Sequence, residues 1–102
     1  MNIPYISAEE VRKNLSMEDA IQCTENVYKL KSQDKAVVWP TIFYEFDPGH
    51  ADMDIKSGYL PEQHIFGHKT VAFMEANVQK GLPDLVGLIA VFSSETGMPL
   101  GL

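Results

Sequence analysis

Hydrophobic positions in the first third of the chain recur every three or four residues, which is typical of amphipathic helices. Ser7 and Glu10 have the spacing of a capping box and predict a short helix over residues 8–15. Ser16 precedes an acidic first turn and predicts a second helix over residues 17–31, with a mixed but mainly apolar stripe. The N-terminal part of the chain is therefore expected to be helical.

From residue 35 onward the chain reads as strands separated by turns. Residues 37–46 are rich in β-branched and aromatic side chains, although Pro40 makes part of that segment an edge or a bulge. Residues 52–60 alternate between apolar and polar, whereas two later segments are more continuously apolar and are expected to be covered on both faces. Those segments are residues 65–74 and 85–92; shorter extended pieces are predicted at 3–6 and 98–102, and turns at 47–49, 81–83 and 94–97. The pattern predicts an α+β domain with two N-terminal helices packed on a mostly antiparallel sheet.

Composition and charge narrow the class of protein. The 102 residues suffice for one domain and carry 14 acidic against 8 basic residues, a net charge of −6. This balance argues against a nucleic-acid surface or an anionic membrane patch, because both need clustered lysine and arginine. The N-terminus lacks a secretory signal pattern, and the longest apolar run is too short to span a bilayer. We therefore expect a cytoplasmic protein in which the lone Cys23 is a buried core thiol.

Metal and phosphate sites are not supported by the spacing of residues. The chain has no Gly-x-Gly-x-x-Gly and no Gly-Lys-Ser/Thr motif, so it carries no recognisable phosphate cradle. His64 and His68 lie in a segment that reads as strand and turn, where they would stand roughly 13 Å apart and could not share a metal ion. Asp52 and Asp54 resemble the start of a calcium loop, but Lys56 occupies a ligand position. No metal or cofactor is therefore expected in this segment.

Five charged or polar residues around the central strands form the candidate site: Asp54, Lys56, Lys69, Asn77 and Asp84. Asp54 and Lys56 are two positions apart, so on a strand they point to the same face. Lys69 lies among apolar neighbours, and burying its ammonium group costs free energy unless an anion pairs with it. The residues alone leave two explanations open: a lysine that pairs with Asp54 or reaches solvent along its stem, or one that binds an anionic ligand.

The same region resembles the ornithine cyclodeaminase/mu-crystallin family, and the resemblance covers essentially the whole chain. The matching motifs, in order, are Ser7-Ala8-Glu9-Glu10-Val11, Gly67-His68-Lys69-Thr70-Val71, Asn77, Gly81-Leu82-Pro83, Gly87-Leu88-Ile89, Phe92 and Glu95-Thr96-Gly97-Met98-Pro99-Leu100. Each motif is weak alone, whereas the ordered set is specific. The resemblance implies that residues 1–102 form an N-terminal substrate-binding and dimerisation segment, followed in the family by a Rossmann NAD(P) domain. The missing dinucleotide motif and the abrupt apolar ending agree with that expectation.

The resemblance also implies roles for the candidate residues. Lys69 falls on the family lysine that binds the substrate's carboxylate, and Asp54 falls on an acidic residue associated with the substrate's amino group. The loop toward the substrate pocket runs through Asn77 and Gly81. This arrangement is chemically coherent, because it offers a charged anchor to each end of an amino acid.

The chain departs from the family pattern at three places. Trp39-Pro40-Thr41 has no arginine where the family usually carries a second carboxylate anchor, Lys56-Ser57-Gly58 replaces the usual Met-Pro before the tyrosine, and Asp84 replaces a common threonine. Lys56 is a candidate for the arginine's task, although it lacks the bidentate fork. These departures put ornithine itself in doubt and leave an amino, imino or keto acid as the expected substrate.

The resemblance implies two alternative functions. The first is the substrate-binding part of an NAD(P)-dependent, homodimeric ornithine cyclodeaminase-like enzyme, either a lyase or an imine or amino-acid oxidoreductase. The type reaction of the family converts ornithine to proline and ammonia. The alternative is a non-catalytic ligand-binding or dimerisation module of the mu-crystallin type, favoured by the missing arginine and nucleotide site. The sequence identifies no catalytic residue, and this segment alone is not expected to be catalytically competent.

Overall fold

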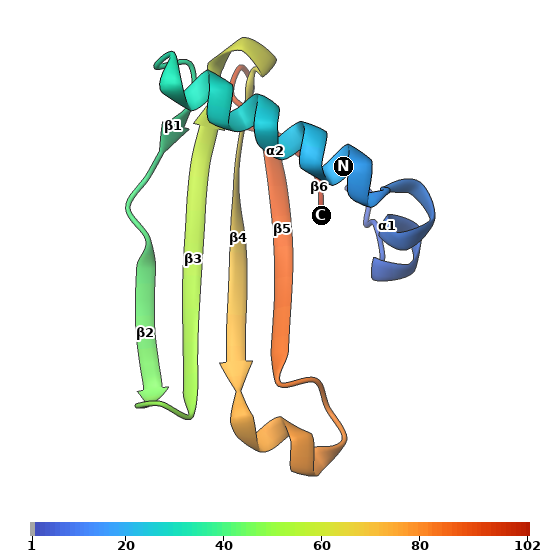
Figure 1. Cartoon of the computed structure of the whole chain (residues 1–102), viewed down its shortest axis with the longest axis vertical. Coiled ribbons are helices and arrows are strands. Elements are labelled where there is room, and N and C mark those ends of the chain that lie inside the picture. The colour runs from blue at the N-terminus through green and yellow to red at the C-terminus, as the bar shows by residue number, and fades with distance from the viewer. Residues whose placement is uncertain (1) are drawn as a thin grey trace.

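The computed structural model describes residues 2–102, which form helices at the N-terminus and a single sheet after them (Figure 1). The elements are α1 (Ala8–Asn14), α2 (Met17–Ser32), β1 (Val37–Val38), β2 (Ile42–Asp47), β3 (Ala51–Leu60), η1 (Pro61–Gln63), β4 (Ile65–Met74), η2 (Glu75–Lys80), β5 (Leu85–Ser93) and β6 (Pro99–Gly101), where η marks a 3-10 helix. Every strand pair is antiparallel. The predicted α+β class is confirmed.

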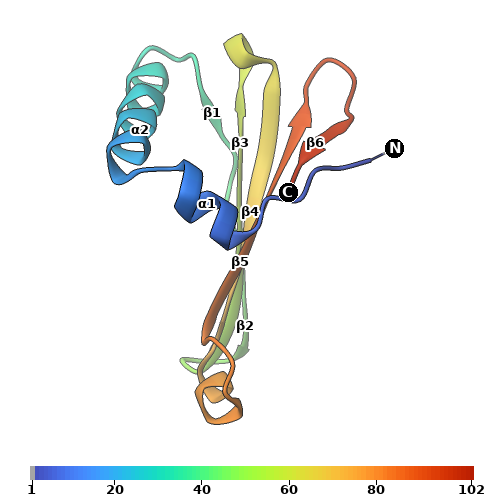
Figure 2. The ribbon, with the colours of Figure 1, turned by 90° about the vertical axis from the view of Figure 1, so that its right-hand side faces the viewer.

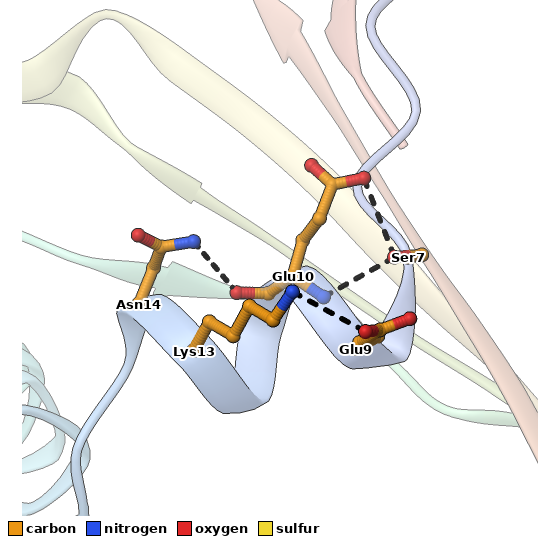
Figure 3. A network of polar contacts seen from close by, with 5 residues as sticks. All are labelled: Ser7, Glu9, Glu10, Lys13 and Asn14. Atoms are coloured by element: carbon orange, nitrogen blue, oxygen red, sulfur yellow. Dashed lines mark hydrogen bonds and ion pairs between the residues drawn. The ribbon is translucent and has the colours of Figure 1, made fainter.

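Both α-helices begin beside the serines that were predicted to cap them. The Ser7 Oγ accepts a hydrogen bond from the Glu10 N–H at 3.2 Å, and the Glu10 carboxylate accepts one from the Ser7 hydroxyl (Figure 3). At α2, Ser16 and Asp19 form a reciprocal capping box. Because the first N–H groups of a helix have no partner within it, each cap contributes about 1 kcal/mol.

The sheet has the strand order β1-β3-β4-β5-β6, and β2 pairs with β3 beyond β1 on the same edge. Pro40 lies between β1 and β2, so the predicted interruption of this edge is confirmed. The three predicted turns are also present, and each places a glycine at positive φ: Gly49 at 81°, Gly81 at 70° and Gly97 at 73°.

The face of the sheet that carries Asp54, Lys56 and Lys69 is called the lysine face. Strand side chains alternate, and the register sets Lys56 of β3, Lys69 of β4 and Ile89 of β5 side by side on it. Helices α1 and α2 lie over the lysine face, because each helix lines a hollow together with residues of that face. Figure 2 shows both helices gathered toward one end of the sheet, while the end with β2 and η2 extends beyond them.

Few residues are buried in this arrangement, because the helices cover only part of one face of the sheet. Among residues 2–102 only Ala36 and Ala90 are buried, at 6% and 5% exposure. The expectation that residues 65–74 and 85–92 are covered on both faces is wrong, because β4 is mostly half-buried and β5 is exposed from Leu85 to Ile89. One sheet with helices over part of one face cannot exclude water from these strands.

Two smaller expectations are also wrong. Residues 3–6 do not form a strand, although the Ile6 N–H donates to the Leu102 carbonyl and the Leu102 N–H to the Pro4 carbonyl, each at 2.9 Å. Cys23 is exposed rather than a core thiol, because α2 buries none of its residues. No helix within residues 2–102 is long and apolar enough to cross a membrane.

Candidate functional site

Lys56 and Lys69 are direct cross-strand neighbours in β3 and β4. The Cβ atoms of such a pair stand about 4.5–5.5 Å apart, and like charges in this position destabilise a sheet. Both lysines are exposed, so the expected burial of Lys69 is wrong. Within residues 2–102 neither lysine forms an ion pair, which rules out the proposed pairing of Lys69 with Asp54. The site therefore presents two lysines in adjacent positions, without a counter-ion from residues 2–102.

Asp54 lies on the lysine face, two residues before Lys56 on β3. Its Oδ1 atom is buried and has no hydrogen-bond partner in the described part of the chain. The residues directly across from Asp54 are Phe43 on β2 and Val71 on β4, and neither side chain can donate a hydrogen bond. A buried acceptor left unpaired costs about 1–3 kcal/mol, so a donor supplied by a ligand would be stabilising here.

Asn77 and Asp84 lie at the far end of the sheet from the lysines. The Asn77 Nδ2 donates to the Pro83 carbonyl at 3.0 Å, and the Asp84 carbonyl accepts from the Met74 N–H at 2.7 Å. Lys69 is five residues from Met74 along β4, roughly 16 Å away at the rise of a strand. The structure thus brings Asp54, Lys56 and Lys69 together and leaves these two apart. Their role in substrate binding stays a prediction.

A hollow of about 350 Å³ lies beside Lys56, between α2 and the lysine face. Its lining is mostly apolar and includes Val27 of α2 and Ile89 of β5. Gly58 and Gly67, which are opposite each other in β3 and β4, form part of its floor. The hollow could hold the apolar body of a ligand whose charge meets Lys56.

The opposite face of the sheet carries a row of aromatic side chains, here called the aromatic face. The ring of Trp39 stacks on that of Tyr59, and Phe66 stacks on Phe92 with ring centroids 5.1 Å apart. His68 stacks on Phe92 in turn, and its buried Nδ1 has no hydrogen-bond partner within residues 2–102. This row could not be predicted from the sequence, because its members come from separate strands and meet only through the register.

His50 and Glu75 form the other notable charged contact, at the end of the sheet away from the helices. The imidazole Nδ1 lies in hydrogen-bond contact with the Glu75 carboxylate, and the Glu75 N–H donates to the His50 carbonyl at 2.9 Å. This hydrogen bond, with the charges of Glu75 and Asp47, raises the pKa of His50 above its usual value. The contact ties the β2–β3 turn to η2, and it lies outside the lysine face.

The sequence did not predict that Lys56 and Lys69 are cross-strand neighbours. This pairing depends on the register of β3 against β4, which η1 and His64 set; His64 has a φ of 56° and ends the 3-10 turn. Lys56 lies four residues before Leu60 and Lys69 four residues after Ile65, and Leu60 and Ile65 are the pair that flanks the turn. An equal count from the two ends of the turn therefore pairs the lysines. Neither strand shows the pairing by itself.

The NAD(P) implied by the family resemblance does not fit the helix ends of residues 2–102. Dinucleotide phosphates bind at free N–H groups of a helix N-terminus, which a glycine-rich turn exposes. Here the side chains of Ser7 and Ser16 each accept a hydrogen bond from one of those N–H groups, and the first turns of both helices carry acidic residues that repel phosphate.

Comparison with known proteins places the chain in a family. The model of the ornithine cyclodeaminase/mu-crystallin family matches residues 4–102. The alanine dehydrogenase of Archaeoglobus fulgidus is 30% identical over 103 residues, which cover 98% of this chain and 30% of that protein. The chain therefore spans about 30% of the length of this relative.

Solved structures agree with the fold. An archaeal alanine dehydrogenase dimer with bound NAD has a TM-score of 0.89 at 31% identity, covering 99% of this chain and 30% of that one. The Δ1-pyrroline-2-carboxylate reductase of Thermococcus litoralis, in complex with NADH and L-proline, has a TM-score of 0.89 at 24% identity. The match covers 97% of this chain and 31% of that one. On the match over residues 4–102, this chain belongs to the ornithine cyclodeaminase/mu-crystallin family.

Proposed function

We propose that this chain is the substrate-binding part of an NAD(P)-dependent enzyme that acts on a small amino, imino or keto acid. Lys69 binds the substrate's carboxylate, Lys56 supplies a second positive charge beside it, and Asp54 accepts a hydrogen bond from the substrate's amino or imino nitrogen. The cofactor binds outside residues 2–102. The observation that carries this proposal is a group on one face: two lysines without an ion-pair partner among residues 2–102, and one carboxylate whose buried oxygen lacks a hydrogen-bond partner there.

The charges of this group match the two ends of an amino acid. Lys56 and Lys69 form one row across the sheet, and Asp54 lies two residues along β3, about 7 Å away at the strand rise. Lysine side chains can reach back over part of that distance, so one small molecule can meet both signs of charge. Charge-assisted hydrogen bonds of this kind are stronger than neutral ones.

We also propose that the enzyme is a homodimer and that the partner covers the aromatic face. Trp39 is 39% exposed at one end of the aromatic row, and on the same face Leu88 of β5 is 47% exposed. Contiguous apolar surface of this kind typically marks an interface. The archaeal alanine dehydrogenase, whose structure is a dimer, supports the proposal of a dimer.

Catalytic assays of the full-length protein that carries this chain test the role of Lys69. The protein is assayed with NAD(H) and NADP(H) on amino acids in the oxidative direction, and on a cyclic imino acid and 2-oxo acids with ammonia in the reductive direction. For the substrate that is turned over, Lys69→Met removes one charge-assisted contact of about 2–3 kcal/mol. The expected loss in kcat/KM is therefore roughly 30- to 150-fold.

Lys13→Met provides the matched control, because Lys13 lies on α1, is 70% exposed and forms an ion pair with Glu9, away from the lysine face. This control should keep wild-type kcat/KM. An unchanged kcat/KM in Lys69→Met, with wild-type folding by circular dichroism, would contradict the carboxylate-binding role.

The alternative function is a non-catalytic binding module, and the largely apolar hollow beside Lys56 is the observation that favours it. A module of this kind would bind a carboxylic acid with an apolar body and would turn over nothing in the same panel. Saturable binding without turnover, lost in Lys69→Met, would support this alternative over the enzyme.

A further inference from the structure

We infer that Lys56 makes this site selective for substrates with a second carboxylate, so that the preferred ligand is a short amino or imino dicarboxylic acid. This inference rests on the proposed function, in which Lys69 holds the first carboxylate. It goes further by assigning the second lysine to a different group of the substrate.

The three side chains proposed to bind the substrate do not balance one another in charge. Lys56, Lys69 and Asp54 together carry a net charge of +1, while Asp52 and Glu45 lie further along the face. Neither lysine has an acidic partner within residues 2–102. A monocarboxylic amino acid is neutral overall and leaves this excess in place. An amino dicarboxylate carries a net charge of −1 and removes it, together with the repulsion between two opposed lysines.

Negative charge on the lysine face is concentrated at the end away from Lys56. Beyond Asp54, the next residue of β3 on the lysine face is Asp52, and Glu45 of β2 lies directly opposite it. A second carboxylate at that end would meet two like charges. At the other end, Lys56 borders the hollow under α2. The charges therefore direct the second carboxylate toward Lys56.

A different arrangement has both lysines on one carboxylate, with each ammonium group donating to one oxygen. In that case Lys56 strengthens the binding of every substrate equally. The two arrangements differ in one measurable quantity, which is the ratio of affinities for a dicarboxylate and its uncharged amide analogue.

Isothermal titration of the full-length protein measures that ratio without turnover. The probes are L-aspartate against L-asparagine and L-glutamate against L-glutamine, since each pair differs in charge and hardly in shape. We expect the wild type to prefer one acid over its amide by roughly 10- to 100-fold. Lys56→Met, which keeps the aliphatic stem, should abolish this preference by weakening only the acid. The control Lys13→Met should keep it.

The outcomes separate this inference from the proposed function. Equal weakening of acid and amide by Lys56→Met, or no preference in the wild type, would overturn the dicarboxylate inference and leave the role of Lys69 intact. If Lys69→Met leaves the affinity for every probe that the wild type binds unchanged, the proposed function fails as well. Both lysines are exposed, so neither variant should impair folding, and circular dichroism checks this.

Discussion

Replacing Gly67 with alanine tests the packing that holds β4 against β5 and positions Lys69. A Cβ atom at residue 67 would lie 2.5 Å from the carbonyl oxygen of Ala90. Ordinary van der Waals contact begins at 3.4 Å, so the methyl group is about 1 Å too close. The obstacle is backbone inside a hydrogen-bonded ladder, so no side-chain rotation can relieve the clash.

The expected cost follows from this geometry. Overpacking that forces a backbone shift typically costs about 1–3 kcal/mol, and a rigid ladder places Gly67→Ala near the upper end. For a domain of this size, about 2–3 kcal/mol lowers the melting temperature by roughly 8–24 °C. Because Lys69 is two residues further along β4, the shift should also weaken substrate binding.

Gly87→Ala is the matched control, since its nearest neighbours are the Val71 Cγ2 at 3.3 Å, which can rotate away, and the Thr70 carbonyl at 3.4 Å. Urea unfolding followed by fluorescence of Trp39, the single tryptophan, measures both variants. We expect Gly87→Ala to cost less than about 1 kcal/mol. Equal midpoints for Gly67→Ala and the wild type would refute the close approach of β4 and β5.

Two further predictions concern contacts outside the site. Because hydrogen bonding to Glu75 raises the pKa of His50, that contact stabilises the fold fully below pH 6.5 and is lost as pH rises through the raised value. Glu75→Gln should therefore return the pKa of His50 toward its usual value in an NMR titration, and an unchanged titration would contradict the contact. Ser16→Ala should cost about 1 kcal/mol in urea unfolding by removing the cap of α2, whereas Ser32→Ala, at the helix's other end, should cost less. Equal losses would argue against the cap.

The candidate site was only partly predictable from the sequence. Two-residue spacing placed Asp54 and Lys56 on one face, because side chains on any strand alternate. The position of Lys69 opposite Lys56 required the register of two strands, which a short turn between them determines. The exposure of Lys69 was misjudged because its apolar neighbours indicated a covered strand, whereas much of the sheet has no second layer.

Short-range sequence signals specify the local structure of this protein. The serine caps, Pro40 and the turn glycines act over a few residues, so both helices, the broken edge and the turns follow from short segments. Tertiary structure alone decided which residues meet: the opposed lysines, the buried Asp54 oxygen and the aromatic face. Those contacts join residues far apart in the chain, and their geometry depends on strand register and on which surfaces the fold leaves open. The family pattern could name Lys69, but only the fold showed that Lys56 stands beside it.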